Sequence, residues 1–119
     1  MKRYVLLVAL VAFLGLSAFT ASGQLITTTL KITVLNDLGN PVDSVKVTLY
    51  ASEKDYLESK NPVVPPAYTD AKGVVRFKNL EPRSYFVDAE KGDLSNAGGG
   101  VQTQKLDQRK ANKVNIIIQ

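Results

Sequence analysis

Short stretches in which apolar and polar residues alternate one by one are the feature that most restricts how this chain can fold. In residues 74–78, Val75 and Phe77 fall on one side of an extended backbone. Arg76 and Lys78 fall on the other side, as in a strand with one buried face. The residues just before this strand predict a turn, because Asp70 can accept backbone N–H bonds there. Gly73 supplies a left-handed backbone position, so we expect a hairpin that feeds the strand in register.

The same alternation recurs along the chain. Residues 27–35 and 45–50 predict two strands that pair with each other, and Pro41 ends the first of them because it cannot donate to a central ladder. Further strands are predicted at 84–90, 101–106 and 113–119. The side chains expected to point inward are Leu30, Ile32, Val34, Val45, Val47, Leu49, Val75, Phe77, Tyr85, Val87, Ala89, Val114, Ile116 and Ile118.

Short strands separated by turn residues, without a convincing helix, indicate an all-β domain. We predict a seven-stranded antiparallel Greek-key β-sandwich, in which the inward side chains fill the space between two sheets. The sequence shows no internal repeat and no second domain.

Two irregular segments interrupt the strand pattern. Residues 52–60 are charged and can hold one helical turn, but Pro62, Pro65 and Pro66 force extended backbone after it. Residues 92–100 contain three consecutive glycines, which cost backbone entropy to order. Long loops often carry function, although a solvated connection between sheets is the ordinary alternative. We take the loop 52–68 and the glycine loop 92–100 as the expected contact surface.

The first 23 residues match a secretory signal peptide. Lys2 and Arg3 precede an apolar run at 5–16, and small residues follow up to Gly23. An uncleaved membrane anchor is the alternative, but the apolar run is shorter than the roughly 20 residues that span a bilayer. Cleavage after Gly23 removes 23 of 119 residues and leaves a 96-residue domain, 24–119, with a net charge of +2 instead of +4. We expect export to the periplasm, cell surface or exterior, without stable membrane insertion after cleavage.

The chain contains neither cysteine nor histidine. Disulfides, thiolate metal sites, a cysteine nucleophile and a lipid-modified cysteine are therefore excluded. The commonest metal ligand and general base is missing as well. We expect no cofactor, no metal and no enzymatic activity.

Three segments in order resemble the carboxypeptidase regulatory-like domain, a transthyretin-like sandwich of secreted bacterial proteins. They are Gly39-x-Pro41-Val42 before the strand at 45–49, Thr69-Asp70-x-x-Gly73 before Val75-x-Phe77, and Leu80-x-Pro82-x-x-Tyr85-x-Val87. The chain departs from the family pattern at Ile32, Asn36 and Ser44-Val45. The resemblance implies a non-catalytic accessory module that accompanies enzymes or outer-membrane transporters.

Two kinds of covalent or catalytic chemistry are alternatives to this accessory role. A related sandwich family joins its terminal strands by a Lys to Asn isopeptide bond; Lys31 and Asn115 lie in such strands, but both fall on the outward face. The family positions for the lysine and its assisting acid correspond to Val34 and Ala89, so we do not expect the bond. Asp88 and Glu90 share one strand face roughly 7 Å apart. Such pairs are usually only solubilising charge.

Exposed aromatic residues give the better lead. Tyr50 and Phe86 point away from the core by alternation, as does Ile117, while Tyr56 and Tyr68 flank the proline loop. If they gather, they form an apolar patch for a protein partner in the cell envelope, including an outer-membrane complex. The alternative is that each lies singly under a loop, covered by residues such as Val63 and Val64.

A carbohydrate-binding module that stacks a glycan on Tyr50, Tyr56 or Tyr68 is the second functional hypothesis. No nucleic-acid partner is expected, because Lys46, Lys78 and Lys113 are separated by acids along the sequence.

Overall fold

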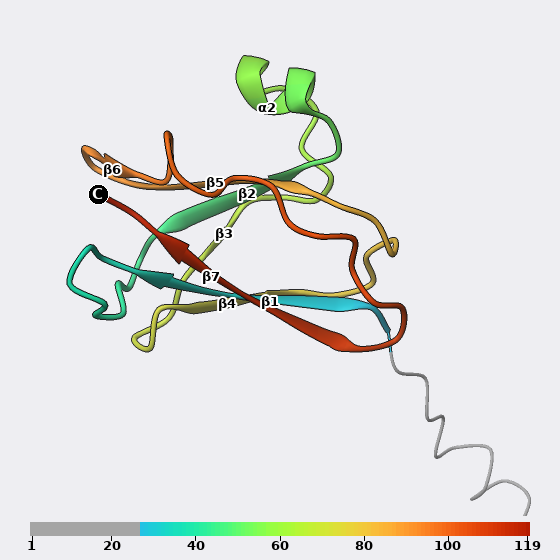
Figure 1. Cartoon of the computed structure of the whole chain (residues 1–119), viewed down its shortest axis with the longest axis horizontal. Helices are drawn as coiled ribbons and strands as arrows, with labels where there is room; N and C mark the ends of the chain where they lie inside the picture. The colour runs from blue at the N-terminus through green and yellow to red at the C-terminus, as the bar shows by residue number, and fades with distance from the viewer. Residues whose placement is uncertain (1–26) are drawn as a thin grey trace, which may run out of the picture.

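The computed structural model describes residues 27–119, which form two stacked β-sheets with one short helix on the outside (Figure 1). The predicted signal peptide and its cleavage site lie outside the described residues. One sheet has the strand order β4-β1-β7 and the other β3-β2-β5-β6. The all-β sandwich architecture is therefore confirmed, while the Greek-key connection stays a prediction. The elements are β1 (Thr29–Leu35), β2 (Lys46–Tyr50), α2 (Glu53–Glu58), β3 (Ala67–Tyr68), β4 (Val74–Phe77), β5 (Phe86–Lys91), β6 (Leu94–Ser95) and β7 (Ala111–Ile117).

The expectation that all strands are antiparallel is wrong for the first and last strands. β1 and β7 run parallel, in a register that extends from Thr29 opposite Ala111 to Leu35 opposite Ile117. Parallel neighbours need a long connection, and here nearly the whole domain lies between the two strands. Apolar and polar residues alternate in the same way in parallel and antiparallel strands, so the sequence pattern does not distinguish the two pairings.

Two predicted strand pairings are also wrong. β1 and β2 belong to different sheets, and so do β3 and β4, so neither pair forms a hairpin. The connection after β1 does turn back on itself, because the Asn36 side chain accepts the N–H groups of Leu38 and Asn40 at 3.0 Å each. The chain then crosses to the other sheet instead of pairing along the first strand.

The turn chemistry expected at residues 69–73 is confirmed, although the turn joins two sheets. Asp70 Oδ1 accepts the N–H groups of Lys72 at 2.9 Å and Val74 at 3.0 Å. Gly73 has a φ of +75°, and its carbonyl accepts the Val34 N–H at 2.8 Å. The turn therefore places β4 beside β1 in the three-stranded sheet.

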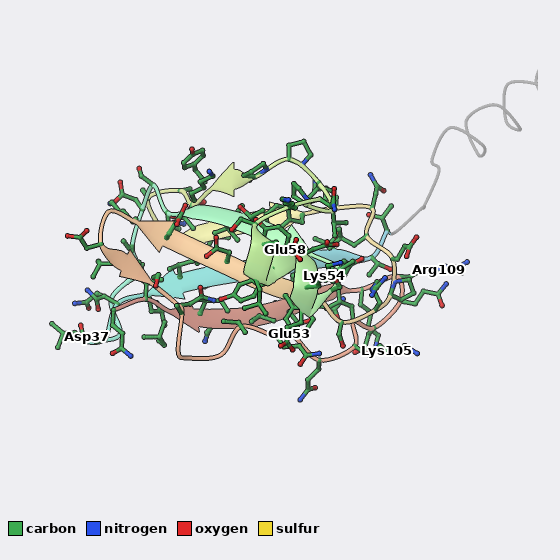
Figure 2. All side chains as sticks on the ribbon, turned by 90° about the horizontal axis from the view of Figure 1, so that it is seen from above. Asp37, Glu53, Lys54, Glu58, Lys105 and Arg109 are labelled. Carbon is green, nitrogen blue, oxygen red and sulfur yellow. The ribbon has the colours of Figure 1, made fainter. Side chains whose placement is uncertain are left out.

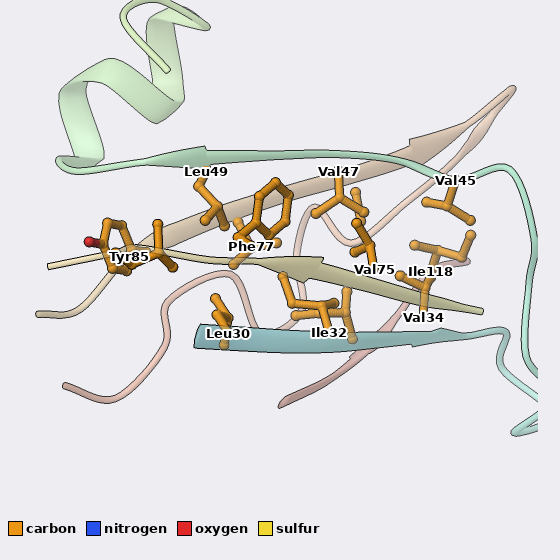
Figure 3. Packing of buried hydrophobic residues seen from close by; sticks show 14 of the residues in the cluster. Leu30, Ile32, Val34, Val45, Val47, Leu49, Val75, Phe77, Tyr85 and Ile118 are labelled. Carbon is orange, nitrogen blue, oxygen red and sulfur yellow. The ribbon is translucent and has the colours of Figure 1, made fainter. Parts of the chain in front are cut away.

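The predicted core side chains fill the space between the sheets. Figure 3 shows Leu30, Ile32 and Val34 of β1 pointing toward the side chains of β2 across the sandwich. Tyr85 is also buried there, and its hydroxyl donates to the Glu81 carbonyl at 2.8 Å, so the polar end of the ring is satisfied. Among the predicted inward residues Val114 alone is only half-buried.

We predict that Gly73→Ala destabilises the domain far more than Gly39→Ala. Both glycines have a positive φ, which costs an alanine about 1 kcal/mol or somewhat more. A Cβ at Gly73 would also lie 2.7 Å from the Val34 carbonyl oxygen, whereas one at Gly39 meets nothing within 4 Å. Urea denaturation should give a loss of about 3 kcal/mol or more for Gly73→Ala. Equal losses for the two variants would show that the close approach to β1 does not matter.

Candidate functional site

An open groove of about 430 Å³ lies between α2 and the glycine loop, on the outer side of the four-stranded sheet. It brings together parts of the two irregular segments that were expected to form the contact surface. Its wall is largely apolar, and two glycines leave the backbone uncovered on one side. The lining residues are Glu53, Tyr56, Leu57, Phe86, Ala97, Gly98, Gly99 and Val101.

The predicted helical turn in 52–60 is confirmed as α2, and local signals fix both of its ends. The Ser52 side chain accepts the Asp55 N–H at 3.1 Å, which caps the helix start. Ser59 has a φ of +53°, so the helix ends there in a left-handed residue. The chain then returns to the sheet, where the Val63 N–H donates to the Leu49 carbonyl at 2.9 Å. The chain is therefore attached to the four-stranded sheet both before α2, through β2, and after it, through Val63.

Three of the four aromatic residues singled out in the sequence lie together beneath and within α2. The ring centroids of Tyr50 and Tyr56 are 6.1 Å apart in an edge-to-face arrangement, and those of Tyr56 and Phe86 are 6.2 Å apart. Tyr50 and Phe86 are direct neighbours across β2 and β5. Burial raises the pKa of Tyr56, and the nearby Asp88 charge raises it further. We call Tyr50, Tyr56 and Phe86 the aromatic cluster.

The expectation that Tyr50 is an exposed aromatic residue is wrong. Its side chain does point away from the core, but only 5% of it is exposed because Tyr56 covers it. Its ring is therefore unavailable to a sugar. Tyr68 is 63% exposed on β3, where it lies opposite Lys46 and outside the cluster. Phe86 and Tyr56 are half-buried and contribute one wall of the groove.

Asn96 holds the other wall of the groove in place, a role that the sequence does not predict. Its Nδ2 donates to the Val87 carbonyl at 2.9 Å, and its Oδ1 accepts the Ala89 N–H at 3.0 Å. The side chain thereby replaces a strand partner along this edge of β5. Only 2% of the residue is exposed. An Asn between Ser and Ala in a loop carries no recognisable pattern, so no sequence signal marked its role.

The strand predicted at 101–106 does not form. In its place, Phe86 and Gln102 make an isolated bridge, and the Val87 N–H donates to the Val101 carbonyl at 2.7 Å. Thr103 then bonds the Tyr85 backbone through both its N–H and its hydroxyl. These contacts and Asn96 together occupy the edge of β5 that β6 leaves open, so the glycine loop is anchored at both ends.

The two carboxylates weighed as a catalytic pair lie outside the groove lining. Burial raises the pKa of Asp88, Glu90 raises it further, and Lys46 lowers it. Among residues 27–119 no group of three acidic, histidine or cysteine side chains is arranged to hold a metal ion. Burial on the sheet surface and the charge of Glu90 therefore account for the raised pKa of Asp88.

The core offers no place for the isopeptide bond. Lys31 and Asn115 lie on the outward faces of β1 and β7, as expected from alternation. Val34 and Ala89 are fully buried at the positions that would carry the lysine and the acid. The buried polar residues of the described chain are Thr28, Thr48, Thr69, Asn96 and Thr103.

None of the helices in the described part of the chain has the length and apolar character needed to cross a bilayer.

Comparisons with known proteins identify the fold. No family model matches the sequence, and no curated protein is significantly similar to it. A Streptococcal ancillary pilin is similar in structure, with a TM-score of 0.61 and 17% identity over 81% of this chain and 33% of the pilin. The major pilin subunit of Bacillus cereus is similar with a TM-score of 0.51 and 16% identity over 77% of this chain and 29% of the pilin. The chain thus spans about a third of each pilin, and the similarity supports the β-sandwich fold.

We predict that Asn96→Ala lowers the free energy of unfolding by about 2–4 kcal/mol, because it leaves the Ala89 N–H and the Val87 carbonyl buried without partners. Asn115→Ala is the matched control, since Asn115 is exposed on β7 and should change stability by less than about 0.5 kcal/mol. Urea denaturation measures both. If Asn96→Ala lowered the free energy of unfolding no more than Asn115→Ala does, the Asn96 amide would not support the edge of β5.

A second prediction concerns pH. Because the pKa of Asp88 is raised in the folded state, the fold loses stability as pH rises from about 3.8 through that higher pKa. Asp88→Asn removes this loss, so the variant should be more stable than the wild type at pH 7. The difference should shrink toward pH 3. Asp37→Asn, in an exposed turn, is the control in the same urea titrations. A difference that is independent of pH would contradict the assignment to Asp88.

Proposed function

We propose that the chain is an exported, non-catalytic β-sandwich module that binds a protein partner at the bacterial cell surface or in the envelope. The groove between α2 and the glycine loop is the observation that carries this proposal. Within residues 27–119 every buried side-chain nitrogen and oxygen has a hydrogen-bond partner. The interior of this described part of the chain therefore offers no unpaired polar side-chain group that a ligand would complete.

The groove has the chemistry of a protein-binding site. Leu57 is 70% exposed at its rim, although it belongs to the short helix that packs over the aromatic cluster. An exposed leucine next to Tyr56 and Phe86 gives apolar area that a partner side chain can cover. Gly98 and Gly99 present backbone without side chains, which lets an extended segment approach closely. These features fit an apolar peptide segment or loop of another protein.

The fold similarity gives a context for such binding. The two similar structures are described as an ancillary pilin and a major pilin subunit. We infer by analogy of fold that this chain also serves in an assembly of protein subunits outside the cytoplasm. The resemblance to carboxypeptidase regulatory-like domains supports the same accessory role, and it favours a partner in an outer-membrane complex. Cleavage of the leader after Gly23 would release the domain for this role.

Leu57→Glu should test the groove directly. We expect it to reduce capture of envelope proteins by the purified exported chain about tenfold, because it places a charge in the apolar wall. The melting temperature should stay close to that of the wild type, since Leu57 is mostly exposed.

Tyr68→Ser is the matched control, because Tyr68 is an exposed aromatic residue outside the groove. Capture should be quantified by mass spectrometry of proteins cross-linked to the bait. If Leu57→Glu leaves the captured proteins unchanged, or if Tyr68→Ser removes the same proteins, the groove is not the binding site.

A further inference from the structure

The outer face of the three-stranded sheet carries a row of positive charges that the sequence does not show. The strand register places Arg76 and Lys113 on either side of Lys31, one from each neighbouring strand. Neighbouring strands lie about 4.8 Å apart, so the row crosses the sheet in about 10 Å. Lys78 follows Arg76 on the same side of the chain. We call Lys31, Arg76, Lys78 and Lys113 the basic row. Lysines that are interleaved with acids in sequence therefore gather on one face, contrary to the expectation from spacing alone.

Within residues 27–119, the strands of this sheet turn no carboxylate to the face of the basic row. The nearby carboxylates belong to the flanking turns, where Asp70 precedes β4 and Asp107 lines a pocket with Lys113. The single ion pair within residues 27–119 joins Lys91 to Asp43 elsewhere, so the row makes none. Asp70, in the turn before β4, has a lowered pKa chiefly because it accepts the Val74 N–H, with a smaller effect of the Arg76 charge. Like charges side by side across strands are unfavourable unless something anionic covers them. The other outward residues are Thr29, Thr33, Leu35, Val74, Ala111, Asn115 and Ile117.

The opposite side of the sandwich is acidic. β5 turns Asp88 and Glu90 outward, and α2 adds three more carboxylates above the same sheet. Figure 2 shows Glu53 and Glu58 on the helix over this face, together with Lys54. Besides Lys54, the outward cation on β2 is Lys46, so the carboxylates outnumber the lysines. We call Asp88, Glu90, Glu53, Asp55 and Glu58 the acidic set.

Each of the two faces also carries exposed apolar area. Ile117 is 44% exposed on the same sheet face as the basic row, four residues along β7 from Lys113, and the register sets Leu35 next to it. On the acidic side Leu57 projects from α2. An apolar contact surrounded by opposite charges is the usual composition of a specific protein interface.

We propose that the basic face of one copy of this chain packs on the acidic, groove-bearing face of a second copy. Because the two surfaces differ, the contact is head-to-tail, and repetition adds further copies in an open row. The inference rests on the proposed function in that α2 and the groove belong to the acidic face. It names a second copy of the chain as one partner of that face.

Self-association of the full exported chain should be measured by sedimentation velocity. We expect concentration-dependent association at low ionic strength that is lost near about 0.5 M salt, where charges are screened over a few ångströms. Lys31→Glu with Lys113→Glu should weaken association about tenfold or more, and so should Glu58→Lys with Glu90→Lys. An equimolar mixture of the two double variants should associate again, because one then has two acidic faces and the other two basic faces.

Lys105→Glu with Arg109→Glu is the matched control. It makes the same change in net charge as Lys31→Glu with Lys113→Glu, and Figure 2 shows both residues toward one end of the sandwich. This variant should associate like the wild type. Equal weakening by all three double variants, or no recovery in the mixture, would overturn the proposal.

A wild-type chain that stays monomeric at low salt would also overturn the proposal, and binding of that monomer to anionic lipid vesicles through Lys31 would assign the basic row to a membrane surface. Loss of envelope capture in Leu57→Glu alongside a monomeric wild type would leave the proposed function standing and reject only the self-association.

Discussion

The structure depends on the contact between the inner faces of two sheets. Leu30, Ile32 and Val34 on one side meet Val45, Val47 and Leu49 on the other, and all six are fully buried. Burying such side chains stabilises the fold by about 1.5–3 kcal/mol each, and without disulfides there is no other strong constraint. Because strand residues alternate, fixing these inward positions also fixes which residues face outward. The binding surfaces are a consequence of the core.

The sequence predicted local structure well because the signals for it are local. Asp70 and Gly73 determine the turn between them, and Ser52 caps the helix that begins at Glu53 by accepting the Asp55 N–H. What local signals do not contain is the sheet to which each strand belongs. The turn at 69–73 is compatible with a hairpin and with a crossing between sheets. The parallel pairing of β1 with β7 sets Thr29 opposite Ala111, near the other end of the sequence. In place of the strand predicted at 101–106, residues 101–103 make an isolated bridge to Phe86, and Asn96 supplies the next bonds along the edge of β5.

The candidate site was only partly predictable for the same reason. Alternation placed Tyr50 and Phe86 on the outward face, and the register that makes them neighbours then brought them together. It did not reveal that Tyr56 covers Tyr50, because the position of α2 depends on the return of the loop to β2 at Val63. Tyr68 shares the outward face of the sheet but lies at the far end of β2. Of the four aromatic residues, three therefore form the aromatic cluster, and Tyr68 stays apart from it.

Strand register also accounts for the distribution of charge. Lys31, Arg76 and Lys113 are far apart in the sequence and carry acids between them, yet each faces outward at the same level of one sheet. A slip of one residue in β1 would turn Lys31 into the core and Ile32 into solvent, so the packing that sets the core fixes the basic row as well. The row is thus as well defined as the core that holds it. Because these three like charges lie side by side across the strands, an anionic surface that covers them reduces their mutual repulsion.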